Sequence, residues 1–94
     1  MTQILRARRL LTERGWLDDH QLRIDEGVIT AIEPIPAATV LRDAELLAPA
    51  YIDSHVHGGG GVDVMDDAPD VLDKLALHKA REGVASWLPT TVTA

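Results

Sequence analysis

The spacing of apolar residues changes near residue 50, and this change limits the folds that the chain can adopt. From Gln3 to about Leu47, short alternating segments are separated by turn residues, a pattern typical of small β-sheets. From Tyr51 onward the order becomes strand, glycine loop, helix and strand, which is the order of a right-handed parallel βαβ unit. The sequence therefore predicts an α/β chain with strands at residues 1–49 and a βαβ unit at residues 50–94.

Four short strands are expected in the first half, at residues 4–11, 20–25, 28–32 and 45–48. In the second of these, Leu22 and Ile24 fall on one face, which is the period-two pattern of a half-buried strand. The turn at residues 25–27 ends in a glycine, where positive φ is favourable, so a hairpin is predicted with the third strand. Pro34 and Pro36 mark a connector before the fourth strand.

A fifth strand, at residues 51–57, carries two histidines. Because side chains alternate along a strand, Asp53, His55 and His57 are expected on the same face. The four consecutive glycines Gly58 to Gly61 then end this strand in a loop that no side chain crowds.

A helix is expected from about residue 69 to residue 82. Asp66 or Asp67 is expected to cap its beginning, and Gly83 lies just beyond its end. The β-branched and apolar stretch at residues 85–93 predicts the next strand, with Pro89 in an irregular or terminal position.

Composition limits the partners of the chain. With no cysteine, any bound metal must be held by His, Asp or Glu. The net charge of −6 disfavours nucleic acid and anionic membrane surfaces as partners. No apolar run reaches the roughly 18–20 residues of a membrane-spanning helix. The first residues lack the apolar segment of a secretory signal, so a cytoplasmic location is expected.

The segment His55-Val56-His57 is the candidate metal site. Two imidazoles on one strand face lie close enough to share a cation, and the glycine loop leaves access for a substrate. In barrels of parallel strands, active sites lie at the C-terminal strand ends. Taken alone, the pair also fits two solvated histidines with no function. Asp53 could orient an imidazole or make a structural hydrogen bond, and the glycine loop could contact a phosphate.

The residues around the pair resemble a known superfamily. The run Ala48-Pro49-Ala50-Tyr51-Ile52-Asp53 before it resembles the approach to the first barrel strand of amidohydrolases, with Ala50 in place of the customary glycine. The segments 57–66 and 86–93, with their glycine-rich loop and Leu-Pro-Thr, resemble N-acetylglucosamine-6-phosphate deacetylases. Residues 17–29 resemble the N-terminal strands of that family, so the likeness covers essentially the whole chain.

The resemblance implies a small β-sandwich, built from both ends of the full chain, and a (β/α)₈ barrel that holds a divalent cation such as Zn, Fe or Mn. It also implies hydrolysis of the acetamide of N-acetylglucosamine 6-phosphate, a small-molecule amino-sugar phosphate, by a homodimer. By the same resemblance, His55 and His57 match the first-strand metal ligands. Some members replace this pair, which leaves open whether it holds the sole metal or a second one.

The resemblance places the catalytic and remaining ligand residues beyond these 94 residues, so the chain is expected to be too short for the whole enzyme. Two alternatives stay open. One is an amidohydrolase acting on a different amide or cyclic imide, and the other is a noncatalytic truncated fragment.

Overall fold

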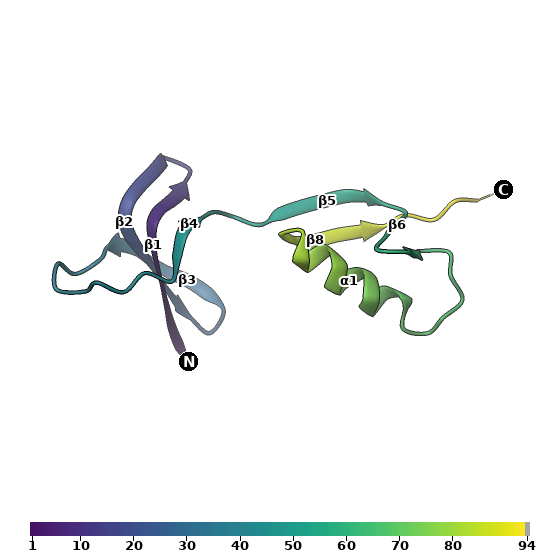
Figure 1. Cartoon of the computed structure of the whole chain (residues 1–94), viewed down its shortest axis with the longest axis horizontal. Helices are drawn as coiled ribbons and strands as arrows, with labels where there is room; N and C mark the ends of the chain where they lie inside the picture. Colours follow the sequence, from purple (N-terminus) through teal and green to yellow (C-terminus); the bar gives the residue numbers. More distant parts are fainter. Residues whose placement is uncertain (94) are drawn as a thin grey trace. The chain divides into compact units, whose positions relative to one another are not determined.

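The structure is a computed structural model that describes residues 1–93 (Figure 1). The chain divides into two compact units, the first at Met1–Pro49 and the second beginning at Ala50. Among residues 1–93, no helix is long and apolar enough to cross a membrane.

The first unit is a four-stranded sheet in the order β3-β2-β1-β4. Its strands are β1 (Thr2–Thr12), β2 (Gly15–Asp25), β3 (Val28–Pro34) and β4 (Ala44–Leu47). The first three pair antiparallel in sequence order, and β4 pairs parallel with β1. The predicted hairpin between the second and third strands is therefore confirmed.

The second strand is longer than expected and begins at Gly15 instead of His20. Glu13 and Arg14 form a tight turn closed by the Thr12–Gly15 pair, and Gly15 has a φ of 99°. The polar residues at 18–20 lie within β2, where His20 Nδ1 is 2.8 Å from the Asp18 carbonyl oxygen. The expected start of this strand at residue 20 was wrong, because the pairing with β1 extends from Asp25 back to Gly15.

One face of this sheet carries apolar side chains in cross-strand register. Leu10 lies opposite Leu17 on one side and Leu47 on the other, and Leu22 lies opposite Ile32. These residues line a hollow of about 820 Å³. Leu10 and Leu22 are buried, whereas Ile32 remains 48% exposed.

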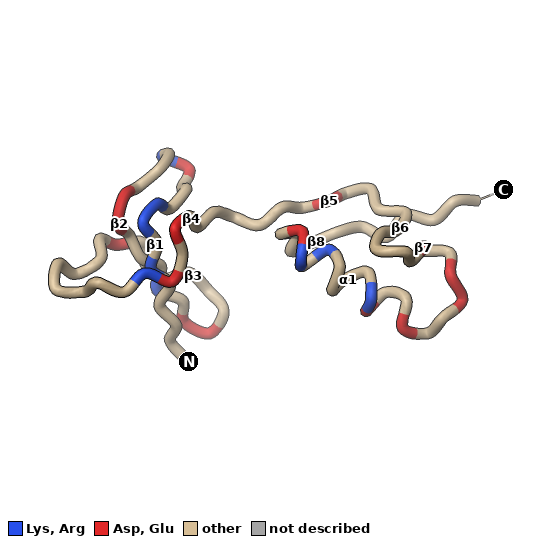
Figure 2. Tube along the Cα trace, in the orientation of Figure 1, with Lys and Arg blue, Asp and Glu red and all other residues tan. Residues whose placement is uncertain are grey.

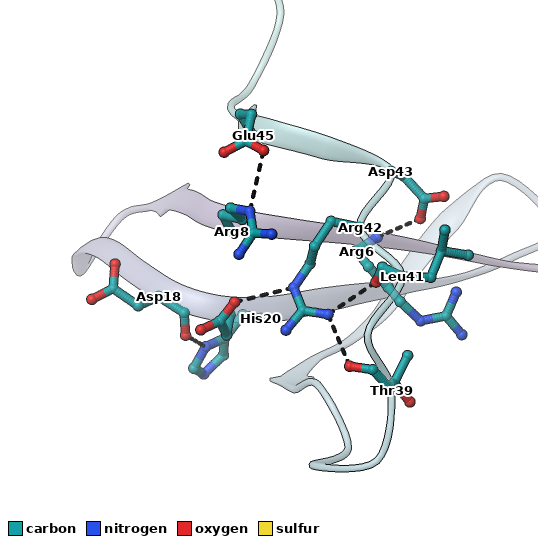
Figure 3. A network of polar contacts seen from close by, with 10 residues as sticks. Arg6, Arg8, Asp18, His20, Thr39, Leu41, Arg42, Asp43 and Glu45 are labelled. Atoms are coloured by element: carbon teal, nitrogen blue, oxygen red, sulfur yellow. Dashed lines mark hydrogen bonds and ion pairs between the residues drawn. The ribbon is translucent and has the colours of Figure 1, made fainter.

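The connector between β3 and β4 is held by polar contacts (Figure 3). Arg42 donates to Asp19 Oδ1 and to the carbonyl oxygens of Thr39 and Leu41. Asp43 Oδ2 accepts a hydrogen bond of 2.8 Å from the Arg6 amide. These contacts fix the connector that Pro36 was expected to mark. Pro34 was also expected in the connector, but it is the last residue of β3 and lies opposite His20. An edge strand such as β3 tolerates a proline at this position.

The second unit contains a parallel βαβ arrangement, as predicted. It comprises β5 (Tyr51–Val56), β6 (Gly58–Gly59), β7 (Val62–Asp63), α1 (Val71–Arg81) and β8 (Val84–Pro89). β5 and β8 pair in parallel, and α1 connects them (Figure 1). The helix buries Val71, Leu75 and Lys79. The α/β character and the β-rich first part were expected, but residues 1–93 contain no closed barrel.

The glycine run is not entirely a loop. Gly58 pairs with Asp63 and Gly59 with Val62 in a small antiparallel hairpin, and the strand before it ends at Val56. Gly60 and Gly61 form its turn with φ values of 60° and 81°, which glycine adopts at little cost. The loop prediction missed this hairpin because it depends only on backbone pairing.

The helix begins at Val71, with Asp70 as the N-cap residue but without a side-chain cap hydrogen bond. The expected capping by Asp66 or Asp67 was wrong, because Asp66 Oδ2 instead accepts a hydrogen bond from the Asp63 amide. At the other end, Gly83 follows the helix with a φ of 84°, as expected. Pro89 is the last residue of β8, which agrees with its predicted terminal position. The strand was expected to continue to residue 93 and instead ends at Pro89, because proline has no amide hydrogen to donate to a partner strand.

Candidate metal centre

The rings of His55 and His57 come together at the end of β5. Their Nε2 atoms are 2.8 Å apart, and the ring centroids are 4.6 Å apart with an interplanar angle of 78°. Both side chains are exposed, whereas Val56 between them is 3% exposed. Alternation along the strand thus turns both imidazoles to the same side and buries the residue between them.

The two Nε2 atoms fit as a partial donor set for one cation. Two nitrogens bound to one Zn²⁺ at about 2.0–2.1 Å lie roughly 2.9–3.4 Å apart. The observed 2.8 Å separation requires only a small outward rotation of the rings to reach that range. Within residues 1–93, no three or more His, Asp or Glu side chains gather at one point. The pair would therefore supply two ligands of a site that needs others.

Asp53 acts on the backbone of the histidine pair. Its Oδ1 accepts a hydrogen bond of 3.2 Å from the His55 amide, and its Oδ2 lies 3.4 Å from Lys79 Nζ. Of the two interpretations of Asp53, the structure supports the structural hydrogen bond.

Lys79 links the helix to the strand that carries the pair. The charged residues of the second unit lie mainly on α1 and the segment before it (Figure 2). Lys79 is only 9% exposed and also pairs with Glu82 at 3.1 Å. The hydrogen bond with Glu82, followed by that with Asp53, raises the pKa of Lys79, and the same contact with Lys79 lowers the pKa of Glu82. The ammonium therefore stays charged between two carboxylates.

Thr90, which follows β8, makes four contacts around the end of β5. Its amide donates to the Val56 carbonyl oxygen at 2.7 Å, and its hydroxyl oxygen accepts from the Val56 amide at 3.1 Å. The hydroxyl donates to the Leu88 carbonyl oxygen at 3.1 Å. The Thr90 carbonyl oxygen lies 3.0 Å from His57 Nδ1. In the sequence, Thr90 stands out only as part of the Leu-Pro-Thr motif. Its position directly after a proline was the available signal.

A hollow of about 380 Å³ lies beside His57. Besides His57, it is lined by Gly58, Gly59, Gly61, Val62, Asp63 and Asp66. Asp63 Oδ1 accepts from the Met65 amide at 2.8 Å, and Asp66 Oδ2 accepts from the Asp63 amide at 2.9 Å. The two carboxylates thus shape the turn, and the glycines leave open space next to the histidine.

The comparison with family models gives no match. Individual proteins do match. The chain is 83% identical over all of its 94 residues to the N-acetylgalactosamine-6-phosphate deacetylase of Escherichia coli O157:H7, of which it covers 25%. It is 41% identical over 95% of its length to the N-acetylglucosamine-6-phosphate deacetylase of Vibrio furnissii, of which it covers 24%. The chain belongs, as an N-terminal portion, to the N-acetylglucosamine-6-phosphate deacetylase family.

Solved deacetylase structures agree with this membership. The N-acetyl-D-glucosamine-6-phosphate deacetylase of Mycobacterium smegmatis matches with a TM-score of 0.76 and 27% identity over 98% of this chain. A structure of a point mutant of that enzyme, in complex with N-acetyl-D-glucosamine-6-phosphate, matches with a TM-score of 0.74 and 28% identity. The present deacetylase-family chain covers 27% and 25% of those two chains. It therefore spans about a quarter of the length of its relatives.

Proposed function

We propose that the protein containing this chain hydrolyses the acetamide of an N-acetylhexosamine 6-phosphate, with the help of a divalent cation, to the hexosamine 6-phosphate and acetate. The membership in a deacetylase family supports the reaction. The observation that carries the proposal of a metal is the histidine pair, whose Nε2 atoms face each other 2.8 Å apart beside an open hollow.

The substrate sugar has two candidates. The sequence resemblance and the Vibrio furnissii relative favour N-acetylglucosamine 6-phosphate. The relative at 83% identity is named for N-acetylgalactosamine 6-phosphate, and this much greater identity favours the galactose epimer. Both sugars carry the same acetamide and phosphate, so the proposed chemistry is the same.

In the proposed site, His55 and His57 bind the cation through Nε2. A bound Zn²⁺, Fe²⁺ or Mn²⁺ supplies a Lewis acid for the amide carbonyl and lowers the pKa of a coordinated water. The glycine-lined hollow leaves room beside His57 for a substrate. Asp53 stabilises the strand in two ways: its carboxylate accepts a hydrogen bond from the His55 amide, and it pairs with Lys79.

We also propose that β5, α1 and β8 are the beginning of a (β/α)₈ barrel, and that the first unit contributes one layer of a small β-sandwich. The parallel pairing of β5 with β8 supports the first part of this proposal. The apolar hollow on the first sheet supports the second. The expected homodimer remains a proposal, which sedimentation of the complete protein would test.

The test is acetate release by the complete protein that carries this sequence. Metal-stripped protein is reloaded with Zn²⁺, Fe²⁺ or Mn²⁺ and given each of the two N-acetylhexosamine 6-phosphates. We expect acetate release with at least one metal and a preference for one epimer. Absence of release from both sugars with all three metals would contradict the proposal, and a panel of other amides and cyclic imides would then examine the alternative amidohydrolase activity.

A further inference from the structure

The end of the β5–β8 pairing is irregular, and Thr90 compensates for it. The register shifts between Asp53 and Val56, and Val56 lies opposite Pro89. The Val56 amide, in a residue that is 3% exposed, finds its acceptor in the Thr90 hydroxyl instead of a backbone carbonyl. Because an unpaired buried amide is costly, this hydroxyl holds the end of the strand in place.

The Thr90 carbonyl determines which nitrogen of His57 carries hydrogen. A carbonyl oxygen only accepts hydrogen bonds, so His57 Nδ1, at 3.0 Å, must be the donor. In a neutral imidazole, this leaves Nε2 of His57 with a free lone pair. The Nε2 atom of His55, 2.8 Å away, must then carry the hydrogen of that contact.

We propose that Thr90 is the positioning residue of the histidine pair, and that it prepares His57 to bind a cation through Nε2. This inference rests on the proposed metal site. The two histidines are unequal: His57 already has the required tautomer, whereas His55 must move its hydrogen from Nε2 to Nδ1 before it can bind. The contact of a ligand's second nitrogen with a carbonyl is a known way to fix ring orientation.

The Thr90 carbonyl belongs to the backbone and cannot be removed by substitution. The Thr90 hydroxyl can be removed, so substitutions of this side chain test the positioning role. The hydroxyl bonds to the Val56 amide and to the Leu88 carbonyl, one on each strand. These two bonds hold the residue whose carbonyl faces His57. Thr90→Val keeps the side-chain shape but loses both bonds, and Thr90→Ser keeps both.

The first experiment titrates Zn²⁺ alone into metal-stripped complete protein by calorimetry. The Zn²⁺ equivalents whose binding is lost in His57→Ala are those that depend on the histidine pair. For these, we expect Thr90→Val to weaken binding by about tenfold or more, as outer contacts of metal ligands commonly do, and Thr90→Ser to remain within about twofold. Thr91→Val, at an exposed neighbouring position, is the matched control and should bind as the unchanged protein does.

The second experiment does not depend on any Thr90 variant folding. Nitrogen-15 spectra of the metal-free, histidine-labelled protein, assigned with His57→Ala, report the tautomer of each neutral ring. We expect hydrogen on Nδ1 of His57 and on Nε2 of His55. The opposite tautomer at His57, unchanged Zn²⁺ affinity in Thr90→Val, or equal weakening in Thr90→Ser would overturn the proposal. Neither measurement uses the sugar substrate, so failure of deacetylation is distinguishable from failure of this inference.

Discussion

The imidazole ring of His78 lies against the backbone of Gly59, so that a Cβ atom at position 59 would be 2.7 Å from His78 Cδ2 and 3.0 Å from its Nε2. His78 projects from α1, and its Nε2 lies 3.0 Å from Glu82 Oε1 one helical turn further along. The helix therefore contacts the glycine hairpin immediately after the histidine pair. A side chain at position 59 would therefore have to displace the His78 ring.

Gly59→Ala is expected to destabilise the complete protein by about 1–3 kcal/mol, because the added methyl group overpacks the His78 ring. Combining it with His78→Ala should recover most of this loss, since the obstructing ring is removed. Denaturant unfolding of the two single variants and the double variant measures the coupling.

Gly58→Ala is the matched control for this pair. Its Cβ would meet the backbone oxygen of Val62, so His78→Ala should not rescue it. Equal rescue of both glycine variants would show that His78 does not cause the restriction at position 59.

Lys79→Met should lower the thermal midpoint because it leaves Asp53 and Glu82 without their shared ammonium group. Lys74→Met provides the comparison on the same helix, since Lys74 pairs with Asp70 at 3.3 Å while its side chain is 59% exposed. Exposed pairs contribute little, so the drop in Lys79→Met should be roughly twofold larger or more. If calorimetry shows the same decrease in thermal midpoint for both variants, the Lys79–Asp53 pair does not stabilise the contact between α1 and β5.

The first unit should lose stability in acid through Glu33. The side-chain amide of Gln21, and then the guanidinium of Arg23, hold the pKa of Glu33 below its ordinary value of 4.5. The unfolded chain therefore binds a proton at this position more readily than the folded chain, so this contribution is present above 4.5 and disappears as the pH falls through the folded pKa.

Glu33→Gln tests this pH dependence. The amide does not titrate, so the thermal midpoint of the variant should fall less steeply between about pH 6 and pH 3 than that of the unchanged protein. A slope identical to that of the unchanged protein would show that Glu33 does not contribute.

The features that could be predicted from the sequence are those that depend on local pattern. Alternation indicated the strands and placed His55 and His57 together, and glycine correctly indicated the end of α1. Pro89 indicated an irregular or terminal strand position, although the strand was expected to run on to residue 93. Strand, helix and strand in succession indicated the parallel pairing of β5 with β8.

The features that could not be predicted depend on contacts between distant positions. His57 and Thr90 are 33 residues apart, and their contact follows from an irregular register that no local pattern records. The same holds for His78 and Gly59, which meet only when α1 folds back over the hairpin. Capping by Asp66 failed because the Asp63 amide competes for the same carboxylate.

The apolar hollow of the first unit gives a prediction for the isolated 94-residue chain. Ile32 and Ile29 line this hollow and are 48% and 56% exposed. Contiguous apolar surface of this kind favours association, so sedimentation of the isolated chain should show species larger than a monomer. Ile32→Glu should reduce that association, because it places a charge where another apolar surface would pack. Val40→Glu is the matched control: Val40 is 90% exposed and lies outside the hollow, so this change should leave association as it was. A chain that stays monomeric at every concentration would show that the hollow does not need covering.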